Sequence, residues 1–241
     1  MISILPVAGL PEVREGDDVG ALIAAAAELQ DGDIVVVAQK IVSKAEGRVV
    51  RLEDVEPSAR ALELAGPRSD PRKLEVILCE TKSIIRSRGT LVIAETAHGF
   101  VCASAGVDGS NAPEAGTLVL LPVDSDASAR AIRASILAQS GAEVSVIVSD
   151  SFGRPFRRGT TDVAIGVAGL APLIDLRGTT DRAGYVLRTS QVALADEIAG
   201  AADLVRGKAD GVPAVVVRGL KTSGDGAATD LVIRAERDLF R

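Results

Sequence analysis

The segment that best indicates the fold is an apolar run with polar residues directly after it: residues 144–159 read VSVIVSDSFGRPFRRG. Its apolar part predicts a buried strand, which delivers an acid and a hydroxyl, Asp150 and Ser151. A Gly-Pro turn and three arginines follow. Carboxylate and hydroxyl oxygens suit a hard cation such as Mg²⁺, and guanidinium groups suit phosphate or carboxylate. The combination indicates a metal–phosphate site, with a solvated loop of compensating charges as an equal alternative.

Similar apolar runs recur along the chain and are mixed irregularly with helical patterns. The expected strands are residues 2–7, 34–38, 91–95, 100–105, 144–148, 163–168 and 213–217. The expected helices are residues 19–29, 57–65, 71–87, 127–139 (capped by Asp126 and ended by Gly141) and 191–205. Because the two kinds of element do not alternate strictly and no repeat is evident, we predict an α+β fold of two interleaved lobes rather than a doubly wound sheet.

Composition narrows the class of function. The 241 residues carry a net charge of -6 with scattered Lys and Arg, and few side chains are aromatic, so nucleic acid is not an expected partner. The amino terminus does not have the pattern of a signal peptide, and the longest apolar run, residues 21–27, is too short for a membrane span. We therefore expect a soluble cytoplasmic protein that does not bind membranes.

Cysteine and histidine are scarce. Cys79, Cys102 and His98 are the only residues of these types, so they cannot form a structural zinc cluster. Both cysteines are expected to be buried free thiols, as in a reducing compartment. A single histidine makes Ser-His-Asp or Cys-His catalysis a weak proposition, and His98 beside Gly99 is expected in a loop or at a strand end.

Three other segments are more polar than their surroundings: residues 9–13, 39–48 and 106–111. A lysine in 39–48 can act as a point charge on phosphates, although a solvated lysine is the more common case. Asp108 supplies a hard oxygen, but taken alone 106–111 is better read as an Asx-type turn. Asp108 and Asp150 each follow an apolar run, so we expect them to converge at one sheet edge, where two acids can hold metal ions against nucleotide phosphates.

Two common nucleotide motifs are absent. The sequence contains no P-loop, since Gly207-Lys208-Ala209 lacks both the spacing and the hydroxyl, and no Gly-x-Gly-x-x-Gly follows a strand. A bound nucleotide would therefore need a less common fold.

Several motifs occur in a fixed order over nearly the whole chain: LPVxGLP at 5–11, VSKAEGR at 42–48, AGVDxSN at 105–111, DSFGRPFRRG at 150–159, DEIA at 196–199 and GVPAVVVRG at 211–219. Together they resemble the coenzyme F420-0:L-glutamate ligase family, whose enzymes build the γ-linked glutamate tail of coenzyme F420. The resemblance implies a GTP-dependent amide ligase that uses Mg²⁺ or Mn²⁺, with two ions expected and K⁺ assisting. It also implies a family-specific α+β fold and an intertwined homodimer.

The resemblance implies roles for individual residues by motif position. Asp108, Asp150 and Ser151 would be metal ligands, and Asp108, Asp150 and Lys44 the catalytic residues. The residues expected around GTP are Leu10, Pro11, Glu12, Val13, Gln39, Lys40, Lys44, Asn111, Val205, Arg206, Gly207, Lys208, Ala209, Asp210 and Gly211. Residues 1–241 would form one ligase domain, either alone or as the amino-terminal part of a longer protein with a flavin-binding, reductase-like domain, as in some bacterial members.

Coenzyme F420-0 and L-glutamate are both anionic, so the site needs cations beyond the metals. Arg154, Arg157 and Arg158 are the candidates, with a structural salt bridge as the alternative for Arg158. Phosphorylation by GTP would convert the acid to an acyl phosphate that the glutamate amine attacks. Two other functions stay open: a metal-dependent nucleotide phosphohydrolase, and a non-catalytic nucleotide- or flavin-binding module.

Overall fold

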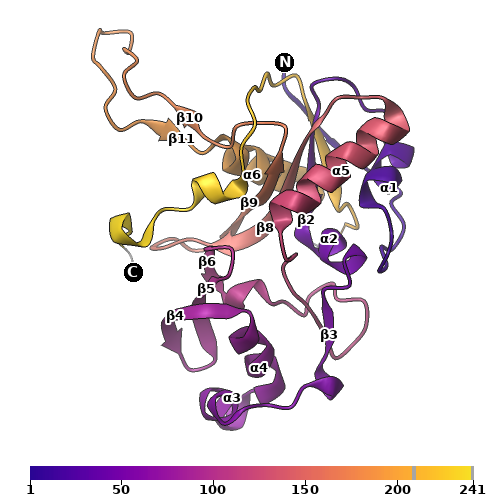
Figure 1. Cartoon of the computed structure of the whole chain (residues 1–241), viewed down its shortest axis with the longest axis vertical. Coiled ribbons are helices and arrows are strands. Elements are labelled where there is room, and N and C mark those ends of the chain that lie inside the picture. The colour runs from indigo at the N-terminus through magenta and orange to yellow at the C-terminus, as the bar shows by residue number, and fades with distance from the viewer. Residues whose placement is uncertain (208–209, 240–241) are drawn as a thin grey trace.

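The computed structural model describes residues 1–207 and 210–239 and confirms an α+β fold. Its larger lobe is built on a five-stranded sheet in the order β1-β12-β2-β8-β9 (Figure 1). The strands are β1 (Ser3–Pro6), β2 (Ile34–Ala38), β8 (Ser145–Gly153), β9 (Thr160–Ala168) and β12 (Ala214–Arg218). Only β2 and β8 run parallel, and the other neighbours are antiparallel, so the sheet is mixed.

Helices cover both faces of this sheet. Helices α1 (Val19–Ala26) and α5 (Ser125–Ser140) pack together on the face nearer the viewer in Figure 1, and α6 (Leu194–Arg206) lies behind it. Covered on both faces, β2 is apolar along its length, and Ile34 through Val37 are fully buried. This burial explains why the apolar runs identify the central strands correctly.

The smaller lobe lies below the sheet in Figure 1 and has a separate hydrophobic core. It contains β3 (Val49–Arg51), α3 (Ala59–Ala65), α4 (Pro71–Cys79), β4 (Thr81–Arg88), β5 (Leu91–Thr96), β6 (Val101–Ala103) and β7 (Thr117–Val119). The chain enters this lobe through β3, directly after α2 (Gln39–Ala45), and leaves it through β7, before α5 begins. The lobe is therefore one continuous insertion, and the segments of the two lobes do not interleave.

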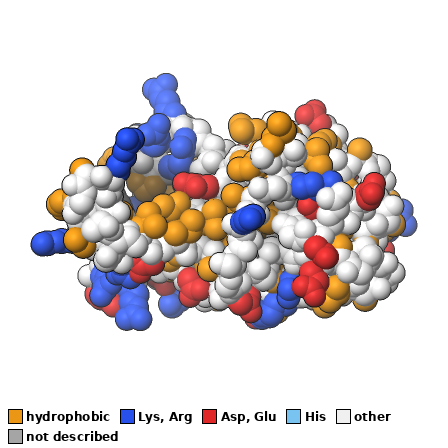
Figure 2. Space-filling view, turned by 90° about the horizontal axis from the view of Figure 1, so that it is seen from above, with side chains coloured by type: hydrophobic (Ala, Val, Ile, Leu, Met, Phe, Trp, Pro, Cys, Tyr) orange, Lys and Arg blue, Asp and Glu red, His pale blue; other side chains and the backbone are white. Residues whose placement is uncertain are grey.

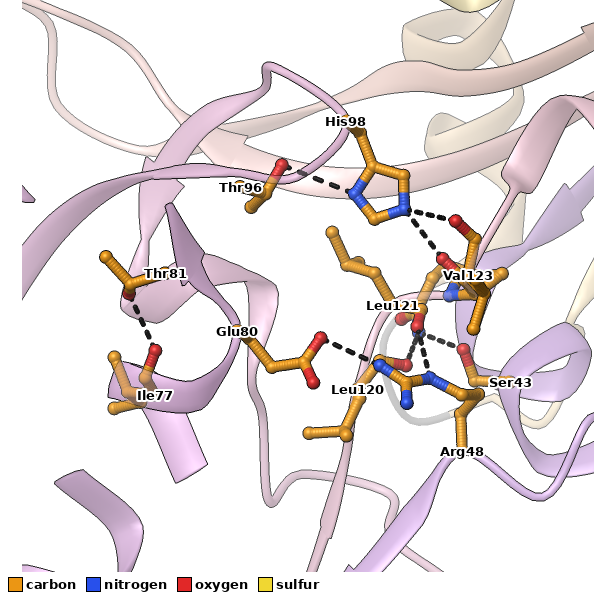
Figure 3. Close-up of polar contacts among 12 residues, drawn as sticks. Ser43, Arg48, Ile77, Glu80, Thr81, Thr96, His98, Leu120, Leu121 and Val123 are labelled. Carbon is orange, nitrogen blue, oxygen red and sulfur yellow. Dashed lines mark hydrogen bonds and ion pairs between the residues drawn. The ribbon is translucent and has the colours of Figure 1, made fainter. Parts of the chain in front are cut away.

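The junction between the lobes is held by polar contacts of Arg48 (Figure 3). Its backbone N–H donates to Ser43 O, and its carbonyl accepts from Leu120 N. Its guanidinium donates to Leu121 O at 2.9 Å and pairs with Glu80 at 2.7 Å. Arg48 thus ties the outgoing strand, the returning strand and α4 together.

His98 adds a second contact at this junction (Figure 3). Its Nε2 lies 2.8 Å from Pro122 O and 3.0 Å from Val123 O, so this nitrogen carries the proton. His98 lies in the turn between β5 and β6, as predicted. Its role in the structure is to hold that turn against the chain that returns to α5.

Peripheral segments complete the larger lobe. A long arm, residues 174–192, projects from it and is closed by β10 (Ile174–Asp175) and β11 (Gln191–Val192) (Figure 1). Short 3₁₀ turns occupy Leu52–Asp54, Gly66–Arg68, Ser104–Gly106, Ala228–Leu231 and Ala235–Arg237. None of the helices in the described part of the chain has the length and apolarity that crossing a bilayer requires.

Three local predictions were wrong. The predicted helix 71–87 ends at Cys79, and Thr81–Arg88 forms a strand because it pairs antiparallel with β5. Cys79 is exposed, whereas Cys102 is buried as predicted. Strand β8 continues to Gly153, so Asp150 and Ser151 lie inside a strand rather than in a loop, because β9 extends the ladder past the end of β2.

The cap of α5 also differs from the prediction. The capping residue is Asp124, whose carboxylate accepts from Ala127 N at 2.8 Å, while Gly141 ends the helix as predicted. Asp126 is buried, and its Oδ1 accepts from Val167 N at 2.7 Å and from Ala228 N at 2.8 Å. Asp126 therefore fastens the carboxyl-terminal segment to the edge of the sheet.

We expect Asp126→Ala to lower the free energy of unfolding by about 3 kcal/mol, because two buried backbone N–H groups lose their acceptor. Urea unfolding followed by circular dichroism measures the loss. Asp126→Asn is the matched control, since its amide oxygen can still accept both bonds and should retain most of the stability. Equal losses in the two variants would contradict this role.

Candidate active site

A cleft of about 710 Å³ lies at the boundary between the lobes. The larger lobe contributes the loop 10–13, the start of α2, the end of β8, Gly207 and the residues 211–213. The smaller lobe contributes α4, through Lys73, and the segment 102–111. The parallel pairing of β2 with β8 sets Ala38 beside Ser149, so that Lys40 and Asp150 emerge at the same end of the sheet. Ligands of open α/β sheets commonly bind at such carboxyl ends.

Asp108 reaches this cleft from the smaller lobe. It follows the 3₁₀ turn Ser104–Gly106 and bridges Val119 through its backbone. The two acids thus face one cleft from different lobes, and the expectation that they share a sheet edge was wrong for Asp108. Asp108 accepts a bond of 2.8 Å from Lys40 Nζ, and Ser110 donates from its backbone and its hydroxyl. Burial opposes ionisation, but these donors outweigh it and lower the pKa of Asp108 to about 2.

Asp150 has the opposite electrostatic setting. Burial raises the pKa of its carboxyl, and the negative charge of Asp108 adds to this, while the charges of Lys40 and Arg206 oppose it. The two acids are therefore close enough to repel each other. A site that holds two repelling carboxylates is stabilised by a cation. Cys102 also lines the cleft, and burial raises the pKa of its thiol to about 12, so the metal-free protein holds it as a neutral thiol.

Two polar side chains of α2 already have partners within the protein. Lys44 Nζ lies 2.5 Å from Glu12 Oε1, and the Lys44 side chain is 9% exposed. Gln39 is buried and donates to Ser43 Oγ at 2.5 Å and to Leu120 O at 2.8 Å. Gln39 thus supports the wall of the cleft, whereas Lys44 places a positive charge in it.

Part of the cleft wall is a largely buried polar network that the sequence did not reveal. Asp162 of β9 forms an ion pair with Arg206, the last residue of α6. Ser149 and Ser151 of β8 both donate to Asp162, at 2.9 Å and 2.6 Å. The sequence did offer one signal, the carboxylate of Asp162 directly before the apolar run 163–168. It was missed because the predicted strand began at residue 163, one residue after Asp162.

The other predicted residues divide into three groups. Those that line the cleft are Leu10, Pro11, Glu12, Val13, Gln39, Lys40, Lys44, Asp108, Asn111, Asp150, Ser151, Arg206, Gly207 and Gly211. Val205 and Asp210 are described but do not line it, and Lys208 and Ala209 lie outside the described residues. Arg154, Arg157 and Arg158 lie on the exposed turn between β8 and β9, and they do not line the cleft either.

Comparison with known proteins shows the family of the chain. The family described as F420-0:Gamma-glutamyl ligase matches residues 9–219, which include all the lining residues from Leu10 to Pro213. The chain belongs to the F420-0:gamma-glutamyl ligase family. Two relatives named Coenzyme F420:L-glutamate ligase, from Methanothermobacter thermautotrophicus and Methanopyrus kandleri, are each 46% identical over 100% of this chain, covering 99% and 98% of the relative. A third relative with that name, from Methanocaldococcus jannaschii, is 42% identical over 96% of this chain and 94% of its own length.

The oxygen donors of this F420-0:gamma-glutamyl ligase family member fit a hard divalent cation. Among residues 1–207 and 210–239, no three His, Cys, Asp or Glu side chains gather closely enough to form a metal site alone. Mg²⁺ is commonly held by one or two carboxylates and completed by phosphate oxygens and water. Asp108, Asp150 and the hydroxyl of Ser151 therefore suit a metal that binds together with a nucleotide.

Proposed function

We propose that this chain is a GTP- and divalent-metal-dependent ligase that adds L-glutamate to coenzyme F420-0 and extends a γ-linked glutamate tail. The proposal is carried by one observation: Asp108 and Asp150 line one cleft in a member of this ligase family. Asp108, Asp150 and Ser151 are the proposed ligands of two Mg²⁺ or Mn²⁺ ions, with K⁺ as an assisting ion.

The chemistry requires activation of a carboxylate, because direct amide formation would expel an oxide-like leaving group. GTP would phosphorylate the carboxylate of F420-0, the glutamate amine would attack the acyl phosphate, and phosphate would leave. Cations held by the two acids would neutralise phosphate charge and so admit an anionic nucleophile. The chain's own contribution is then positioning: Asp108 on one lobe and Asp150 on the other hold the reacting groups together.

The nucleotide is proposed to lie along the larger lobe, between the loop 10–13 and the segment 205–211, with Gln39, Lys40 and Asn111 nearby. Lys44 is the proposed phosphate contact from α2. Its ammonium is nearly buried but pairs with a Glu12 side chain that is 67% exposed. Phosphate can therefore compete for Lys44 with a partner that water already solvates.

We expect Lys44→Ala to raise the KM for GTP about tenfold, equivalent to the loss of roughly 1.4 kcal/mol of binding, with a smaller change in the KM for glutamate. Steady-state kinetics with each substrate varied in turn measures both values. Lys82→Ala, which removes an exposed lysine paired with Glu95 outside the cleft, is the control. Unchanged GTP dependence in Lys44→Ala would assign Lys44 a structural role.

The anionic substrates need a positive charge that is not already neutralised. Four basic side chains of the described residues line the cleft, and Lys40, Lys44 and Arg206 pair with Asp108, Glu12 and Asp162. Lys73 of α4 lines the cleft and forms no ion pair with any other described residue, so we propose it as a contact for a substrate carboxylate or phosphate. Arg154, Arg157 and Arg158 stay predicted substrate contacts, for parts of F420-0 that extend outside the cleft. Their turn adjoins the cleft, because Gly153 and Thr160 at its base line the cleft.

We expect Lys73→Ala to raise the KM for F420-0 or for glutamate about fivefold and to leave the KM for GTP within about twofold, because one solvated ion pair is worth roughly 1 kcal/mol. Arg72→Ala is the matched control on the same helix, because Arg72 pairs with Asp70 and does not line the cleft. If Lys73→Ala and Arg72→Ala changed all KM values equally, Lys73 would not be a substrate contact.

Mass spectrometry of the products tests the proposed function. The protein is incubated with F420-0, GTP, L-glutamate and Mn²⁺, and we expect F420 with added glutamate together with GDP. GDP release that needs neither F420-0 nor glutamate would instead indicate a nucleotide phosphohydrolase. Nucleotide or flavin binding without any product would indicate a non-catalytic module.

A homodimer is the proposed assembly. The arm 174–192 exposes Ile174 (41%), Tyr185 (63%) and Val186 (46%), which a second copy of the chain can cover. Figure 2 shows that the face seen from above carries a strip of hydrophobic side chains, with Lys and Arg gathered around a hollow at one end. Light scattering of the intact chain and of a variant with a shortened arm tests this assembly.

A further inference from the structure

The largely buried network in the cleft wall joins three elements at the point where β8 enters the site. Asp162 is 2% exposed, Ser149 1% and Arg206 7%. The residues directly before Ser149 on β8 are apolar, and Val146, Ile147 and Val148 are fully buried. A buried ion pair often adds little to stability compared with packed apolar side chains. Its position at the cleft therefore points to a role in the site.

The hydrogen bonds of Asp162 fix where the hydroxyl proton of Ser151 lies. An ionised carboxylate only accepts hydrogen bonds, so the 2.6 Å contact between Ser151 Oγ and Asp162 Oδ1 must carry the serine proton. The lone pairs of Ser151 Oγ then remain available, and Ser151 lines the cleft. An oxygen in this state can bind a cation but cannot donate to a phosphate.

Ser149 shows how the network differs two residues earlier on the same strand. Its hydroxyl donates to Asp162 Oδ2 and accepts from both Arg206 Nη1 and Nη2 at 3.0 Å, so its hydrogen-bonding capacity is used inside the protein. Arg206 supplies the positive charge that keeps Asp162 an acceptor. The network thus satisfies Ser149 completely and leaves Ser151 open toward the cleft.

We infer that Asp162 is a positioning residue that turns the hydroxyl proton of Ser151 away from the cleft, so that Ser151 Oγ presents a lone pair to a divalent cation bound beside Asp150. The inference rests on the metal site of the proposed function and assigns Asp162 a role within it. Carboxylates that orient the ligands of a metal typically change its affinity 10- to 100-fold when they are replaced.

The test substitution is Asp162→Asn. Arg206 has only donors, so the amide oxygen would turn toward Arg206 and the amide NH₂ toward Ser151. Ser151 Oγ would then accept a bond from the amide, and its own proton would point into the cleft. We expect the Kd for Mn²⁺, measured from the EPR signal of free Mn²⁺ in the presence of GDP, to rise about tenfold or more. Excess Mn²⁺ should restore turnover.

Two further variants separate this role from a loss of stability. Ser151→Ala removes the proposed ligand without disturbing the pair of Asp162 with Arg206, and it should weaken Mn²⁺ binding to a similar degree. Asp33→Asn removes another ion pair with a buried carboxylate, Asp33 with the partly exposed Arg218, just before β2 and at the opposite end of that strand from the cleft. It should lower the melting temperature and leave the Kd for Mn²⁺ unchanged.

The outcomes distinguish this inference from the proposed function. If the unmodified protein binds Mn²⁺ and Ser151→Ala binds it equally well, the inference is overturned and Ser151 is removed from the proposed ligands, while the metal-dependent ligase activity stands. Equal binding by folded Asp162→Asn also overturns the inference. If the unmodified protein with GDP binds no Mn²⁺, the metal-dependent function fails and the inference fails with it. If Asp162→Asn does not fold, the Mn²⁺ affinity of Ser151→Ala decides.

Discussion

Replacing Asp150 with asparagine is expected to reduce glutamylation by about 10³-fold or more while leaving the protein folded. Asparagine has nearly the same shape as aspartate but no charge, so the variant should lose a ligand of the proposed cation without creating a cavity. Losses of this size are typical when a preorganised electrostatic contact to the transition state is removed. Product formation by mass spectrometry, with circular dichroism as the folding control, measures the effect.

The same substitution should not reduce stability. Burial raises the pKa of Asp150 above its ordinary value of 3.8, so the folded protein disfavours the ionised form relative to the unfolded chain. Stability therefore falls as the pH rises from 3.8 through the raised pKa, and the whole penalty is present at higher pH. Without metal and GTP, we expect Asp150→Asn to unfold at the same or a higher temperature at neutral pH. A folded variant with near wild-type turnover would remove Asp150 from the proposed metal site.

Asp108→Asn should lower kcat/KM for GTP by about 10²- to 10³-fold, because the smaller lobe loses its carboxylate in the cleft. The pKa of Asp108 is lowered to about 2, so this acid is ionised throughout the range from pH 5 to 9. Its own titration therefore contributes no slope to the pH–rate profile there. We expect the variant's profile to lie lower throughout, and any acid limb due to Asp150 to move to lower pH, because the variant lacks the Asp108 charge that raises the pKa of Asp150.

Ser110→Ala is the matched control for Asp108. It removes the hydroxyl that donates to Asp108 Oδ2 but keeps the charge and the ion pair with Lys40. We expect less than about a tenfold loss, the value of one hydrogen bond. A loss as large as that of Asp108→Asn would mean that the conformation of the loop, rather than the carboxylate charge, is what matters.

Sequence patterns predicted the parts of the fold that local chemistry determines. Strands covered on both faces, such as residues 34–38, are uniformly apolar and were recognised. The helix expected over residues 71–87 failed because no Gly or Pro separates α4 from β4, and the pairing of β4 with β5 decides its second half. The insertion of the smaller lobe also had no local signal.

The candidate site was predictable where motifs contain its residues and unpredictable where side chains meet through the fold. Asp108 and Asp150 were singled out from strand-end positions and face one cleft. Asp162 and Lys73 were not, since their significance comes from packing across strands and lobes. Arg154, Arg157 and Arg158 do not line the cleft, and their role as substrate contacts stays a prediction, because charge density along the sequence does not reveal where a turn lies.

The insertion of the smaller lobe has a genetic consequence. Val49 pairs with Val119, so the two points where this lobe joins the rest lie side by side. Recombination at these two boundaries, which are neighbours only in the folded protein, can therefore exchange residues 49–119 for those of a relative. Every pairing in the five-stranded sheet would survive the exchange. Such a swap would replace Lys73 and Asp108 together but keep Asp150 and Lys44. Since Asp108 belongs to the proposed metal site, a working exchange must keep a carboxylate at that position, and within that limit acceptor preference can diverge during evolution.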